Sequence, residues 1–103
     1  MDWSKPSREI LNRVRGFQPW PGCYGFRQGH RLHIWKAGPP TATEKAMALA
    51  PGELRAIGRR LFVGCGSGND LIELLEVQSE GKKRMPAAAY LNGNTIEANE
   101  TLT

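Results

Sequence analysis

Apolar residues recur at helical spacing near the start of the chain. Val14 follows Ile10 by four positions and Leu11 by three, while Arg8, Asn12 and Arg15 lie on other faces. Residues at this spacing share one face of a helix. The pattern therefore predicts one amphipathic helix over residues 7–16, and Gly16 suits the position after its last turn.

The segment FQPWPGCYGF, residues 17–26, is dense in aromatic, proline and glycine residues. Residues that precede a proline are pushed out of the α-helical region, so the two prolines end the helix. We expect Phe17, Trp20, Tyr24 and Phe26 to pack the helix onto a sheet rather than to form a stacking platform for bases.

Two hairpins and a loop are predicted in the middle of the chain. Gln28-Gly29 separates two short β-prone runs, which is typical of a hairpin. Gly58-Arg59-Arg60 separates ELRAI from LFVGC and predicts a second hairpin with a basic tip. The Pro- and Ala-rich stretch 38–53 has no periodicity and is expected to be a long loop.

The run DLIELLEVQ, residues 70–78, fits two patterns. Its leucines suit a helix face, and its nearly continuous apolar character suits a strand that is buried on both faces. Propensity alone favours the helix.

Pro86 is expected to open a short alanine-rich helix that ends at Asn92-Gly93, and residues 94–103 are expected to fray. These patterns predict a small sheet-based domain with a helix at either end.

The chain has 103 residues, of which 40% are hydrophobic, enough for one domain but not for a deep cleft. A binding module is therefore expected more than a self-contained enzyme. No apolar run approaches the roughly 20 residues that span a bilayer, and residues 1–9 lack the apolar core of a signal peptide. We expect a soluble cytoplasmic protein in which Cys23 and Cys65 are reduced.

The net charge of +4 is unevenly distributed. Cations are concentrated in residues 1–36 and in GKKR at 81–84, whereas acidic residues gather in 70–80 and in the tail. Segregated basic charge suggests a polyanion such as nucleic acid, but it equally fits a solvated surface.

Three kinds of chemistry are suggested by single motifs and rejected on their context. VGCGSGND at 63–70 looks like the cofactor loop of S-adenosylmethionine-dependent methyltransferases, yet no succession of βα units follows it. We read it as a turn. Cys23, His30, His33 and Cys65 lack the ligand spacing of a zinc site, and no carboxylate pair suits acid and base catalysis. We expect no metal and no catalytic residue.

Several motifs occur in a specific order along the chain, and together they carry a resemblance. The chain resembles the C-terminal domain of the methionyl-tRNA formyltransferase family over nearly its whole length. The residues that carry the likeness are Asp2-Trp3-Ser4, Arg15-Gly16-Phe17-Gln18-Pro19-Trp20-Pro21, Ile34-Trp35-Lys36-Ala37, Pro51-Gly52-Glu53-Leu54, Val63-Gly64-Cys65-Gly66-Ser67-Gly68, Leu74-Leu75-Glu76-Val77-Gln78 and Gly81-Lys82-Lys83-Arg84-Met85.

The resemblance implies a mainly β fold, a small open OB-like barrel with an N-terminal helix and a short C-terminal helix. It implies that residues 70–78 form a strand, against their propensity, and that residues 1–103 form one accessory domain. The family's catalytic residues and its site for 10-formyltetrahydrofolate belong to an N-terminal domain absent from this sequence. No cofactor is therefore expected in this domain. Its implied partners are that catalytic domain, in cis, and initiator methionyl-tRNA.

The expected tRNA contacts are basic residues. Lys82 and Lys83 match the family motif, and the other candidates rest on charge, with a solvated surface as the equal alternative for each. The full set is Lys82, Lys83, Arg84, Arg59, Arg60, Arg13, Arg15, Arg27 and Arg31.

Two other functions remain open from the sequence. Related enzymes, the hydrolase part of 10-formyltetrahydrofolate dehydrogenase and the sugar-nucleotide formyltransferases, carry the same module in a structural role without RNA. An independent OB-type binder of single strands would expose aromatics, for which Trp35 and Tyr24 are candidates, although we expect both in the core. Met1 directly before Asp2 suggests an engineered start at the domain junction.

Overall fold

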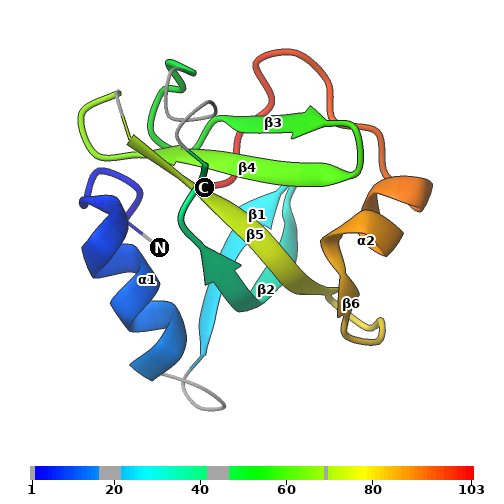
Figure 1. The fold of residues 1–103 in the computed structure, drawn as a ribbon. Helices are drawn as coiled ribbons and strands as arrows, with labels where there is room; N and C mark the ends of the chain where they lie inside the picture. Colours follow the sequence, from blue (N-terminus) through cyan, green and yellow to red (C-terminus); the bar gives the residue numbers. More distant parts are fainter. Residues whose placement is uncertain (1, 17–21, 42–46, 69) are drawn as a thin grey trace.

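A computed structural model describes residues 2–16, 22–41, 47–68 and 70–103. In these residues the chain forms one six-stranded antiparallel sheet with a helix on each side of it (Figure 1). The elements in chain order are α1 (Ser7–Gly16), β1 (Cys23–Arg27), β2 (His30–Gly38), β3 (Leu54–Ile57), β4 (Arg60–Cys65), β5 (Asp70–Ser79), β6 (Met85–Pro86) and α2 (Ala87–Gly93).

The sheet has the strand order β1-β2-β5-β4-β3, and β6 pairs with β5 outside this path. Its strands do not close on themselves, so the predicted fold class, a mainly β and open sheet with two helices, is confirmed. Both predicted hairpins form. Gln28 and Gly29 have φ angles of 54° and 81°, and Gly58 has 61°. In the first hairpin, positive φ at both turn residues matches the twist of the flanking strands.

The run at 70–78 lies within strand β5, as the resemblance implied and against its helix propensity. β5 is central, between β2 and β4, so its main chain is bonded on both sides. Its two faces bury different groups: Ile72 belongs to the main core, and Leu71 packs with Leu49 and Phe62 in a smaller cluster. Burial on both faces overrides local propensity here.

Helix α1 has the predicted bounds and buries Ile10 and Val14. Asp70, at the start of β5, accepts a hydrogen bond from the Ser7 N–H at 2.7 Å. This carboxylate, 63 residues away in sequence, satisfies a free N–H donor in the first turn of the helix. Of the aromatic and proline segment 17–26, residues 17–21 lie outside the described part of the chain. The predicted packing of Phe17 and Trp20 therefore lies outside the described residues.

The last residues of that segment correct a prediction. Tyr24 and Phe26 do not pack α1 onto the sheet, because 38% and 43% of their surfaces are exposed. They lie on the outward face of β1, where alternate residues point inward and outward. Trp35 on β2 is half-buried, in contact with His33 and Arg84, rather than in the core.

The predicted loop 38–53 is irregular where it is described beyond Gly38, the last residue of β2, apart from a bridge at Glu53. Its Leu49 is fully buried, and its backbone passes over Gly64 on β4 so closely that a Cβ there would lie 2.2 Å from the Ala50 carbonyl oxygen. The glycine-rich stretch connects β4 to β5, and Gly66 has φ of 67°, as expected for a turn.

The end of the chain is the second correction. Residues 94–103 do not fray: Leu102 is fully buried in the main core. The tail bonds to the two edges of the sheet. Leu102 N–H donates to the Gly52 carbonyl at 2.7 Å, and Thr103 and Phe26 exchange two backbone bonds of 2.9 Å. The tail therefore bridges β1 and the segment that leads into β3, and it fills the opening that the strands leave.

Both cysteines, Cys23 and Cys65, are buried free thiols. In the described residues there is no helix with the length and apolar character needed to cross a bilayer.

Candidate nucleic-acid interface

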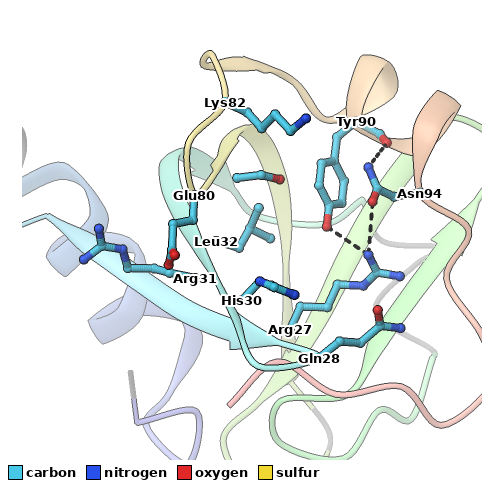
Figure 2. A pocket seen from close by; sticks show the side chains of 10 residues that line it. Arg27, Gln28, His30, Arg31, Leu32, Glu80, Lys82, Tyr90 and Asn94 are labelled. Carbon is cyan, nitrogen blue, oxygen red and sulfur yellow. Dashed lines mark hydrogen bonds between the residues drawn. The ribbon is translucent and has the colours of Figure 1, made fainter.

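A cavity of about 340 Å³ lies where the β1–β2 turn, the end of β5 and helix α2 meet. Figure 2 shows its lining side chains, which come from segments that are far apart in the sequence. They include three of the cations expected to bind RNA, Arg27, Arg31 and Lys82, together with the polar groups of His30, Tyr90 and Asn94.

Arg27 is part of the fold rather than of an open surface. Its side chain is 9% exposed and forms an ion pair with Glu100. It donates to the Tyr90 hydroxyl at 3.1 Å and to the Thr95 carbonyl at 2.9 Å. Burial disfavours the charged form, but the hydrogen bonds with Glu100 and Tyr90 outweigh it and raise the pKa of Arg27. This arginine thus anchors the tail, and its charge is already paired within the fold.

Lys82 and Lys83 are exposed in the turn between β5 and β6. Neither forms an ion pair with any described residue. Two hydrogen bonds to the Lys82 backbone hold the turn. Its N–H donates to the Ser79 carbonyl, and its carbonyl accepts from the side-chain amide of Gln78 at 2.8 Å. Figure 2 shows the Lys82 ammonium extending over the cavity toward Tyr90. These two charges are therefore available to a ligand.

Arg84 is exposed but partly neutralised. Its guanidinium donates to Glu76 at 2.5 Å, and Lys36 lies 3.2 Å from the same carboxylate. The hydrogen bonds from Arg84 and Lys36 hold the pKa of Glu76 below its usual range. Arg84 also lies over the Trp35 ring, 4.6 Å from its centroid.

The other predicted contacts lie elsewhere. Arg60 forms a bidentate pair with Glu73 of β5, with distances of 2.7 and 3.0 Å. Arg59 is exposed in the β3–β4 turn. Arg13 and Arg15 are on α1, which Figure 1 shows on the opposite side of the sheet from the β5–β6 turn. The nine predicted cations therefore do not share one surface. Arg31 and Lys82 are exposed cations that line the cavity, and Lys83 is the exposed neighbour of Lys82.

Sequence reasoning missed the neutral part of this site. His30 was considered only as a metal ligand, and Tyr90 and Asn94 were not singled out, because no motif marks them and α2 reaches the hairpin only in the folded chain. Asn94 is oriented by its amide, which donates to the Tyr90 carbonyl at 3.0 Å. The only signal in the sequence was the short helix itself, which placed Tyr90 near its end.

Comparison with known proteins identifies the class to which this fold and surface belong. Residues 1–95 match the family model described as formyl transferase, C-terminal domain, and the chain belongs to this family. The relatives that the chain matches carry a more specific name. It is 50% identical over 99% of its length to the methionyl-tRNA formyltransferase of Solibacter usitatus, and 48% identical over 90% of its length to that of Koribacter versatilis. The enzyme of the same name from Geobacter sulfurreducens is 41% identical over 94% of the chain.

The chain spans only 31%, 28% and 29% of these three relatives. The chain therefore corresponds to one part of each of these longer enzymes.

Proposed function

We propose that this chain is the accessory domain of a methionyl-tRNA formyltransferase, and that it positions initiator methionyl-tRNA for formyl transfer by the preceding catalytic domain. The observation that carries the proposal is the pair Lys82 and Lys83, two exposed charges without an acidic partner in the described residues, beside an open cavity. In this proposal the formyl donor, 10-formyltetrahydrofolate, binds the catalytic domain, and no reacting group comes from this chain.

The chemistry of the cavity rim suits an A-form RNA stem. Such a stem presents phosphates and 2′-hydroxyls across a shallow minor groove, and proteins bind it through its shape and backbone. Lysines supply the charge for phosphates, while the His30 ring and the Asn94 amide are groups that can bond to a 2′-hydroxyl. The contacts would hold the RNA in register without reading its bases.

The test is a titration of the 103-residue chain with initiator methionyl-tRNA at several salt concentrations. Electrostatic binding of this kind has a dissociation constant on the order of 10⁻⁴ to 10⁻⁶ M. The logarithm of its association constant falls linearly with the logarithm of the salt concentration. We expect Lys82→Ala with Lys83→Ala to lower the affinity. The salt slope should fall by about 0.9 for each phosphate that a lysine no longer neutralises, so by about 2 in all.

The matched control removes two exposed cations from α1, Arg13→Ala with Arg15→Ala. It changes the net charge by the same amount on the opposite side of the molecule. If both double variants weaken binding equally, the interaction follows net charge alone and the proposed site is wrong. Affinity that does not depend on salt would contradict the whole proposal and favour a structural role for the domain.

A further inference from the structure

The outer face of β1 and β2 carries an exposed aromatic pair that the proposed function does not use. Along β1, Cys23, Gly25 and Arg27 point inward, whereas Tyr24 and Phe26 point outward. The two outward rings contact each other edge to face, with centroids 5.9 Å apart. Contiguous exposed apolar surface is typical of interaction sites in soluble proteins.

A cation on the next strand borders this pair. In the register of the hairpin, Phe26 lies opposite Arg31, and Tyr24 lies opposite His33. The Arg31 guanidinium is 5.4 Å from the centroid of the Tyr24 ring. Figure 2 shows the guanidinium of Arg31 at the edge of the cavity, pointing away from Tyr90.

A second stack on the same face is already occupied by protein groups. Trp35 has two partners, the His33 ring at 4.4 Å between centroids and the Arg84 guanidinium at 4.6 Å. Its indole N–H donates to Gln78 at 2.8 Å, and Gln78 in turn bonds the Lys82 carbonyl. This stack supports the face and connects it to the lysine turn, while Tyr24 and Phe26 remain open.

We propose that unpaired RNA nucleotides stack on Tyr24 and Phe26, with Arg31 against their phosphates. Aromatic rings and arginine planes on a sheet stack bases regardless of sequence, and cations hold the backbone that joins them. The charge of this region also suits RNA: Arg31, Lys36, Arg84 and Lys82 outnumber the carboxylates Glu76 and Glu80. The inference rests on the proposed function only in taking RNA as the partner, since it assigns a different surface and a different part of the nucleic acid.

The experiment uses two probes, single-stranded hexaadenylate RNA and a blunt-ended RNA duplex that has no unpaired nucleotide. One aromatic–base stack contributes about 1–3 kcal/mol, which corresponds to about a five-fold or greater change in affinity. We expect Tyr24→Ala and Phe26→Ala each to weaken hexaadenylate binding by at least that factor and to leave duplex binding unchanged. Tyr24→Phe keeps the ring and should bind like the native chain.

The control is Ile57→Ala, which truncates another exposed apolar side chain, 47% exposed, on β3. It should alter neither probe. In the native chain, the ring protons of Tyr24 and Phe26 should shift on addition of hexaadenylate, a measurement that needs no variant to fold.

The two proposals fail separately. If the lysine variants weaken duplex binding but the aromatic variants leave hexaadenylate binding unchanged, stacking is wrong and the proposed function stands. If only the aromatic variants have an effect, the stem-binding site is wrong and stacking stands. If the ring protons shift with the separately produced preceding domain of the Solibacter relative but not with hexaadenylate, the face is a domain interface and the inference is overturned.

Discussion

Replacing Leu102 with alanine is expected to destabilise the fold strongly. The side chain is fully buried in the main core, and the backbone of β1 lies directly against it. A Cβ built on Gly25 would be 2.7 Å from Leu102 Cγ, so the two segments are in close contact. Removing the leucine therefore leaves a cavity between the tail and the sheet.

The size of the effect follows from this burial. Leucine-to-alanine changes in packed cores cost about 2–5 kcal/mol, the cost rising with the volume of the cavity that remains. A domain of this size has about 5–15 kcal/mol of stability in total. A loss of about 3 kcal/mol would lower the melting temperature by about 12–24 °C. The tail would then detach more readily, and the opening between β1 and β3 would be exposed.

Urea unfolding followed by tryptophan fluorescence measures this free energy. The matched control is Leu75→Ala, the same chemical change on β5 at a side chain that is 41% exposed. Surface changes of this kind cost little, and we expect about 1 kcal/mol or less. Equal unfolding free energies for the Leu102 and Leu75 variants would refute the reasoning, because they would mean that the tail does not pack in solution.

Two further predictions concern the loop crossing and the buried ion pair. Gly64→Ala should lower the free energy of unfolding by about 1–3 kcal/mol, because its Cβ would lie 2.2 Å from the Ala50 carbonyl oxygen and the backbone must move. Gly16→Ala, which has open space around it, is the control and should be neutral or slightly stabilising in the same urea assay. Burial tends to raise the pKa of Glu100, but the hydrogen bonds from Arg27 and from a backbone N–H outweigh it and hold that pKa below its usual value of 4.5. Its contribution to stability is therefore complete above the unfolded pKa and is lost as the pH falls through the folded one. Glu100→Gln should be destabilised at pH 7, and its deficit relative to the native chain should shrink below about pH 4; a deficit that is constant with pH would contradict this.

The hairpins, α1 and α2 could be predicted from local patterns because their determinants are local. Gln28-Gly29 supplies the positive φ angles of a two-residue turn, and an amphipathic stripe marks α1. β5 could not be predicted in this way, since its leucines favour a helix and only its place between β2 and β4 makes it a strand. The resemblance supplied that information, because it carries the topology along with the residues.

The errors had a different origin. Residues 94–103 contain few apolar side chains, so their composition is typical of a fraying end, yet Leu102 fills the opening of the sheet and Glu100 pairs with Arg27. Tyr24 and Phe26 were placed in the core because aromatic residues usually lie there. For the tail, the deciding contacts join segments that are more than 70 residues apart, such as Glu100 with Arg27, which local patterns cannot reveal.

The arginines around the first turn show why charge alone does not identify a binding site. Arg27 and Arg31 lie on either side of Gln28-Gly29, and the sequence offers no ground for preferring one as a ligand contact. The two-residue turn sets the register so that Arg27 pairs with His30 and Arg31 with Phe26. Strand alternation then turns Arg27 inward, to Glu100, and Arg31 outward, over Tyr24. Alternation along the two strands thus separates a charge that is paired within the fold from one that lies on the outer face, and a one-residue slip of either strand would turn the side chains of that strand to its other face.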